Sequence, residues 1–136
     1  PVIPDGEVDI LFSLEKLETL RYLDKIRNGA LVLIGEFKIP PLGVSSGQDR
    51  YPDDDEIKMS VSQVSSNFYF VSTLTLAEKA GSTRAHNVVL LGALSAKLEV
   101  PACIWQDVIS EFVPPKYVTL NHQAFLFGRE VGEKAL

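Results

Sequence analysis

The order of apolar and polar positions separates the chain into an N-terminal half with strand-like runs and a C-terminal half with helical periodicity. Short apolar runs bounded by turn residues are typical of strands, and they occur at 8–14, 30–35 and 67–72. Segments 15–26 and 56–64 have the composition of helices. A strand, a helix and a second strand in succession predict a βαβ unit.

Polar residues beside these segments predict where the elements begin and end. Ser13 and Asp55 are the expected N-caps of the two helices, because short polar side chains accept hydrogen bonds from the free N–H groups of a first turn. Asn28-Gly29 is expected to end the first helix, since this pair favours a helix C-terminus. From 39 to 55, proline, glycine, serine and aspartate predict one long loop.

The C-terminal half is expected to form four helices, at 75–80, 83–98, 101–112 and 117–133. The second of these is apolar on nearly every side, which is typical of a helix buried on most sides. Gly92 lies within it and lowers its helix propensity by about 1 kcal/mol relative to alanine. We therefore expect another backbone to approach this helix closely at Gly92.

The length of 136 residues fits a single domain over 1–136. The predicted elements give an α/β fold in three layers, with a largely parallel or mixed sheet, flanking helices and a helical C-terminal half. The net charge of −5 argues against binding to nucleic acid, which needs a basic face. No apolar run approaches the roughly 20 residues that span a bilayer, so we expect no membrane contact and, by default, a cytoplasmic protein.

No complete catalytic constellation is visible, so no catalytic or metal-ligating residue is predicted. His86 and His122 lie in helical stretches, and we expect structural roles for them rather than proton transfer. The acidic run 53–56 lacks the alternating spacing of a calcium loop, and we expect it to be the solvated start of a helix. Cys103 is the only cysteine, too few for an iron–sulfur cluster, and is expected to be a small apolar residue near a helix start.

Three residues are candidates for cofactor binding. Arg84 carries a guanidinium that can bind a carboxylate or a phosphate, and an ordinary surface arginine is the alternative. Asn87 and Asn121 stand in apolar surroundings, where a half-buried amide must find partners. Each of them either ties a helix start to a neighbouring loop or faces a partner subunit or a cofactor.

Five short segments carry a likeness to a known family. They are Pro-Asp-Gly-Glu-Val-Asp-Ile-Leu at 4–11, Ile-Pro-Pro at 39–41, Tyr-Pro-Asp-Asp-Asp-Glu-Ile at 51–57, Asn-Val-Val-Leu-Leu-Gly-Ala-Leu at 87–94, and Leu-Asn-His-Gln-Ala-Phe at 120–125 followed by Gly128. In this order they resemble the gamma-type domain of 2-oxoacid:ferredoxin oxidoreductases, and most closely the indolepyruvate oxidoreductase beta subunit. The likeness covers essentially all 136 residues.

The resemblance implies a division of labour between subunits. The complete enzyme decarboxylates a 2-oxoacid on thiamine diphosphate, passes electrons through iron–sulfur clusters to ferredoxin, and transfers the acyl group to coenzyme A. Thiamine diphosphate, Mg and the clusters are expected on a partner subunit, with coenzyme A at the interface. The family's domain begins with a Gly-rich strand–turn–helix segment that these residues do not match, so we expect that portion to be missing here.

We therefore expect an accessory subunit without a self-contained active site, which packs on the thiamine-binding catalytic subunit and contacts ferredoxin only indirectly. The loop 39–55 and the helix start 84–87 are the expected partner-facing surface. The alternative is a stand-alone ligand-binding or regulatory α/β domain without catalytic activity. That alternative implies a monomer or a homodimer in isolation.

Overall fold

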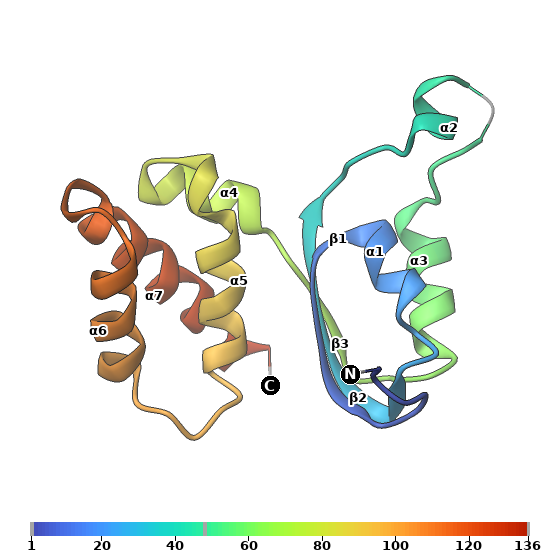
Figure 1. Ribbon diagram of the computed structural model, residues 1–136, viewed down its shortest axis with the longest axis horizontal. Coiled ribbons are helices and arrows are strands. Elements are labelled where there is room, and N and C mark those ends of the chain that lie inside the picture. The colour runs from blue at the N-terminus through green and yellow to red at the C-terminus, as the bar shows by residue number, and fades with distance from the viewer. Residues whose placement is uncertain (1, 48, 136) are drawn as a thin grey trace. The chain divides into compact units, whose positions relative to one another are not determined.

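The computed structural model describes residues 2–47 and 49–135, which form two compact units within 1–70 and 71–136. Figure 1 labels their elements. The first unit contains β1 (Val8–Glu15), α1 (Lys16–Arg21), β2 (Ile26–Phe37), α2 (Leu42–Ser45), α3 (Asp54–Ser62) and all of β3 (Phe68–Val71) except its last residue. The second contains α4 (Thr73–Ala80), the 3₁₀ turn η1 (Thr83–Ala85), α5 (His86–Ser95), α6 (Ala102–Phe112), the 3₁₀ turn η2 (Pro115–Tyr117) and α7 (Val118–Lys134).

The first unit is a parallel sheet with helices packed on it. Its strand order is β1-β2-β3, and β1 pairs with β2 in parallel. Alternate residues of the central strand, Ala30, Val32 and Ile34, are fully buried. They share one core with Ile57 and Val61 of α3. The predicted fold class, with a largely parallel sheet, flanking helices and a helical C-terminal half, is confirmed.

The prediction of the first helix, over 15–26, is wrong in its length, because the helix is shorter. Helix α1 ends at Arg21, and β2 already begins at Ile26. Asn28 and Gly29 lie inside this strand, where the pairing of β1 with β2 shifts register. Gly29 has φ 75°, and its N–H donates to the carbonyl of Val64 at 3.3 Å. The pair therefore forms an irregularity in a strand instead of a helix end, because burial of Ile26 in the core overrides the local helix signal.

Both predicted N-caps of the first unit are also corrected. Ser13 lies in β1 and donates to the carbonyl of Glu15, and it is the Glu15 carboxylate that caps α1 by accepting from the N–H of Glu18 at 2.9 Å. Helix α3 is capped by Asp53 instead of Asp55. Asp53 has an acidic residue three positions later, which allows the reciprocal hydrogen bonds of a capping box.

Within the predicted loop 39–55, the described residues form the one-turn helix α2, and α3 already begins at Asp54. In the second unit, the predicted helix 83–98 is divided into η1 and α5. The prediction of a single domain over 1–136 stays a prediction.

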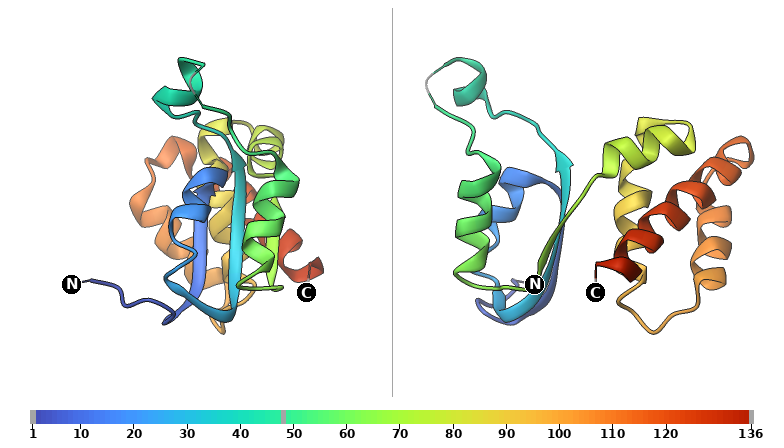
Figure 2. Two further views of the ribbon diagram at one scale, coloured as in Figure 1. Left: turned by 90° about the vertical axis from the view of Figure 1, so that its right-hand side faces the viewer. Right: turned by 180° about the vertical axis from the view of Figure 1, so that it is seen from behind.

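The second unit is built on close contact between α5 and α7, which lie side by side (Figure 2). A Cβ on Gly92 of α5 would meet the carbonyl of Phe125 and would lie 2.8 Å from the nitrogen of Arg129. From the other side, a Cβ on Gly132 of α7 would lie 2.5 Å from the carbonyl oxygen of Ala93. The close backbone approach predicted at Gly92 is confirmed.

Candidate functional site

The structure brings two of the three candidate binding residues together. Arg84 and Asn121 both line a cavity of about 260 Å³ in the second unit. The other lining residues are Ser82, Ala85, Val113, Tyr117 and Leu120. Asn87 is not among them, and it is exposed on α5, so it is not the half-buried amide that the sequence suggested.

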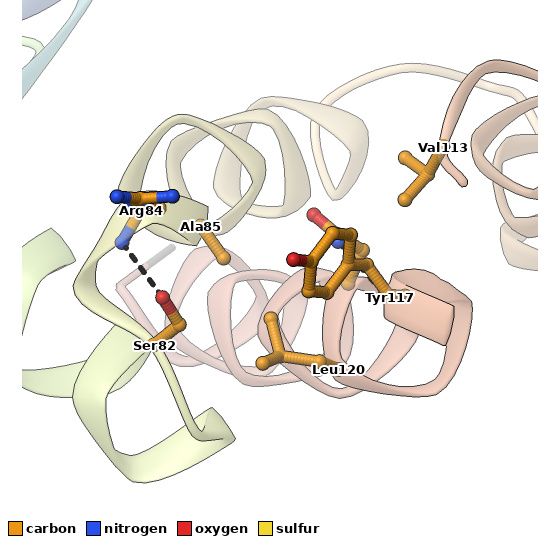
Figure 3. A pocket seen from close by; sticks show the side chains of 7 residues that line it. Ser82, Arg84, Ala85, Val113, Tyr117 and Leu120 are labelled. Carbon is orange, nitrogen blue, oxygen red and sulfur yellow. Dashed lines mark hydrogen bonds between the residues drawn. The ribbon is translucent and has the colours of Figure 1, made fainter. Parts of the chain in front are cut away.

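Three chain segments form this cavity, which we call the Arg84 pocket. Figure 3 shows Ser82 and Arg84 on one side, Val113 and Tyr117 on the other, and Leu120 between them. The first pair comes from the start of η1, and Val113 directly follows α6. Tyr117 and Leu120 come from η2 and the first turn of α7. The pocket therefore unites residues about 30 positions apart in the sequence.

Local structure explains where the residues that line the Arg84 pocket lie. The Ser82 hydroxyl accepts from the N–H of Arg84 at 3.3 Å, and this caps η1. Pro114 and Pro115 end α6 and start η2, because proline cannot continue a helix but fits its first turn. Gly81 has φ 120°, and a Cβ there would lie only 3.2 Å from the Leu120 side chain. Glycine is thus suited to the turn that leads into the pocket.

Arg84 differs from the other arginines in that no ion pair is found for it among the described residues. Four of the five arginines form ion pairs with carboxylates: Arg21, Arg27, Arg50 and Arg129. No such pair is found for Arg84 among residues 2–47 and 49–135, and its side chain is exposed. None of the described lining residues is acidic. Within the part of the chain that the structure describes, the positive charge of the pocket therefore has no counter-ion.

Hydrogen bonds at the start of α7 account for two further polar residues. The Asn121 amide donates to the carbonyl of Tyr117 at 2.8 Å, which closes the first turn of its own helix. His122 Nε2 lies 2.9 Å from the Ser110 hydroxyl and 2.9 Å from the carbonyl of Gln106. His122 thus ties α7 to α6, in agreement with the structural role expected for it.

A second polar cluster, in the first unit, was not found from the sequence. Glu15 lies at the carboxyl end of β1 and is 7% exposed. Its carboxylate accepts from the N–H of Ile39 at 3.3 Å and from the Tyr51 hydroxyl. The same hydroxyl accepts from the N–H of Leu17 at 3.2 Å. These contacts hold both ends of the loop 39–55 at one edge of the sheet.

The neighbouring charges are also paired. Lys16 Nζ, on a residue 5% exposed, lies 2.7 Å from Asp54 Oδ1. The hydrogen bond from Lys16 lowers the pKa of the Asp54 carboxyl. Burial, together with the hydrogen bond to the Glu15 carboxylate, raises the pKa of the Tyr51 hydroxyl above its ordinary value. The hydroxyl therefore stays protonated as a donor, and the cluster is suited to holding the loop in place.

The acidic run 53–56 forms caps and ion pairs, as expected for the start of a helix. Asp53 and Glu56 form the capping box, and Glu56 also pairs with Arg50. Asp55 Oδ1 lies 3.5 Å from Lys58 Nζ. Within the described ranges, no group of three or more His, Cys, Asp or Glu residues could hold a metal ion. Cys103 is exposed in the first turn of α6.

None of the described helices is long and apolar enough to cross a membrane.

Comparisons with known proteins agree with one another on the family. A family model described as pyruvate ferredoxin/flavodoxin oxidoreductase matches residues 1–131. Indolepyruvate oxidoreductase subunit IorB from Thermococcus kodakarensis is 36% identical over 138 residues, which cover 99% of this chain and 68% of that protein. The same subunit from Archaeoglobus fulgidus is 36% identical over 130 residues, covering 94% of this chain and 65% of that protein.

A solved structure supports the fold. The crystal structure of a keto/oxoacid ferredoxin oxidoreductase gamma subunit from Geobacter sulfurreducens matches with a TM-score of 0.65. It is 23% identical, and the match covers 99% of this chain and 69% of that one.

Proposed function

Because the chain belongs to the pyruvate ferredoxin/flavodoxin oxidoreductase family, we propose that it is an accessory subunit of a thiamine-diphosphate-dependent 2-oxoacid:ferredoxin oxidoreductase. The proposed substrate of the assembled enzyme is an aryl pyruvate such as indolepyruvate. The observation that carries the proposal is the 36% identity to an indolepyruvate oxidoreductase subunit over 99% of this chain. In this role the chain packs on the catalytic subunit and helps to form the cleft for substrate and coenzyme A.

Thiamine diphosphate, Mg and the iron–sulfur clusters belong, in this proposal, to the partner subunit. Cys103 is the only thiol in these residues, whereas a cluster needs several cysteine ligands. This donor set therefore does not fit a cluster. The proposed contribution of the chain is to bind the partner and to enclose its cleft, and electrons reach ferredoxin through the partner.

Two exposed apolar surfaces support packing against a partner. On α6, Ile104, Val108 and Phe112 are 50%, 46% and 82% exposed. They are spaced four residues apart, so they form one stripe along the helix. In the loop 39–55, Ile39 and Leu42 are 60% and 86% exposed. Contiguous exposed apolar residues mark interaction sites more often than isolated ones do.

The loop is well suited to such a contact because it is held at both of its ends. The Glu15 cluster fixes Ile39 on one side and Tyr51 on the other. A loop that is already positioned loses less conformational entropy when a partner binds. The partner-facing role expected for 39–55 and for 84–87 thus remains our proposal, with the α6 stripe added to it.

The decisive experiment is co-expression of the full-length protein with the thiamine-binding subunit of the same organism. We expect the two to co-purify and to elute together in size-exclusion chromatography. With coenzyme A present, the complex should reduce methyl viologen in response to indolepyruvate or phenylpyruvate. Replacing Phe112 by aspartate should weaken the complex, whereas Met59→Asp, at a residue 61% exposed on α3, serves as a matched control.

The result that contradicts the proposal is a full-length protein that remains a monomer or homodimer while the thiamine-binding subunit is active without it. That outcome supports the alternative of a stand-alone ligand-binding or regulatory domain. If the complex forms but Phe112→Asp and Met59→Asp have equal effects, the accessory role holds and the α6 stripe is not the contact surface.

A further inference from the structure

The Arg84 pocket combines uncompensated positive charge with hydrogen-bond donors. Arg84 has no carboxylate partner within the described ranges, in a chain whose net charge is −5. Lys116 Nζ lies 4.9 Å from the centroid of the Tyr117 ring, so a second positive charge stands next to one of the lining side chains. The Asn121 amide uses a hydrogen to reach the carbonyl of Tyr117, and an amide nitrogen carries two. The polar side of the pocket is therefore suited to an anion.

The opposite side of the pocket is apolar. Ala85 is 3% exposed, and Val113 and Leu120 are half-buried. The Tyr117 ring stands beside Leu120 (Figure 3) and is itself 43% exposed, so part of its surface is open to a ligand. Aromatic rings favour offset or edge contacts with one another. The anion that fits here therefore also carries an apolar, preferably aromatic, group.

Size limits that group to a single ring system. The cavity measures about 260 Å³. An apolar cavity of about 150 Å³ already takes up benzene, so a ring with a short acidic side chain has enough room. Drug-sized ligands occupy pockets of about 300–1,000 Å³, so a whole coenzyme does not fit.

From these features we infer that the Arg84 pocket binds a small carboxylate that carries one aromatic ring system. The carboxylate pairs with the Arg84 guanidinium, which matches it with two parallel hydrogen bonds. The ring lies against Leu120, Val113 and Tyr117. The inference deepens the proposed function and rests on it for its biological role, because an aryl pyruvate is a carboxylate of this class.

Binding can be tested on the purified full-length protein, without the partner. Phenylacetate is a suitable probe, because it keeps the carboxylate and the ring but has no reactive keto group. We expect saturable shifts of the backbone amide NMR signals of 82–85 and 117–121. Phenylacetamide, which has no charge, should bind at least about tenfold more weakly, since hydrogen bonds to charged groups exceed neutral ones by about that much.

Two arginine variants test whether phenylacetate binds in the Arg84 pocket. Arg84→Gln should also weaken the binding of phenylacetate at least about tenfold. Circular dichroism should show an unchanged fold, because the side chain is exposed. Arg27→Gln is the matched control, since Arg27 is an exposed arginine of the other unit. It should leave the affinity unchanged.

The inference would be overturned by no saturable binding of phenylacetate, by equal binding of phenylacetamide, or by an equal loss of affinity in the two arginine variants. Inorganic phosphate and adenosine 3′,5′-bisphosphate test whether the pocket binds a phosphate group instead of a carboxylate. If either binds at this pocket as tightly as phenylacetate, the aryl carboxylate assignment is wrong. Such failures leave the co-purification experiment unaffected, so they are distinguishable from failure of the proposed function.

Discussion

Replacing Gly128 by alanine would place a methyl group inside the contact between α5 and α7. The new Cβ would lie 2.7 Å from the carbonyl carbon of Val89 and 3.0 Å from its Cα, and it would also meet the carbonyl oxygen. All three are backbone atoms, which cannot turn away as the end of a flexible side chain can. The substitution can be accommodated only if the two helices move apart.

The size of the effect follows from this geometry. Carbon atoms in good contact are about 3.5–4.0 Å apart, so the helices must separate by roughly 1 Å. An extra methyl group in a packed contact costs about 1–3 kcal/mol, and rigid backbone neighbours favour the upper end. Alanine recovers about 1 kcal/mol of helix propensity. We expect a net loss of about 2 kcal/mol in the free energy of unfolding.

Thermal unfolding followed by circular dichroism measures this loss. For a chain of this length, each kcal/mol corresponds to roughly 3–5 °C, so the Tm should fall by about 6–10 °C. Gln123→Ala is the control, because Gln123 is exposed on the same helix. Its Tm should stay within about 2 °C of the unchanged protein, since exposed substitutions have small effects. A Gly128→Ala protein as stable as the unchanged one would refute the close approach of α5 and α7.

Three further predictions concern the first unit. Asp53→Ala removes the capping box and should lower the free energy of unfolding by about 1 kcal/mol in a urea titration, whereas Asp53→Asn should keep most of it. Tyr51→Phe leaves the buried Glu15 carboxylate without its hydroxyl donor and should cost about 1–3 kcal/mol in the same titration, and a cost near zero would contradict the role of this cluster. Because Lys16 lowers the pKa of Asp54 in the folded state, this pair stabilises the fold above the unfolded pKa of about 3.9 and the stabilisation is lost as the pH falls through the folded pKa. In the Asp54→Asn variant, the Tm should therefore decrease less as the pH is lowered. A decrease of Tm equal to that of the unchanged protein would contradict the pairing.

The candidate site was only partly predictable from the sequence. Arg84 and Asn121 were recognisable as polar residues at helix starts, but their positions 37 residues apart gave no reason to place them in one pocket. Val113 and Tyr117 had no signal of their own, because their role depends on where the proline turn between α6 and α7 places them. Asn87 carried the same sequence signal as Asn121 and lies outside the pocket. Asn87 is exposed on α5, whereas Asn121 is half-buried on α7, and only the packing of the helices decides between these two outcomes.

The sequence by itself determined the order of the elements, the class of the fold, the close backbone approach at Gly92 and the resemblance to the family. These follow from signals carried within a few neighbouring residues: apolar periodicity, turn residues, a glycine in an apolar helix, and short ordered motifs. Only the tertiary structure decided that β2 begins at Ile26, since burial in the core outweighs a local helix preference. It also decided that Tyr51 donates to Glu15, 36 positions away, and that Arg84, which has no carboxylate partner among residues 2–47 and 49–135, lines a cavity with Tyr117 and Leu120. Such contacts depend on how distant segments are brought together, which local patterns do not encode.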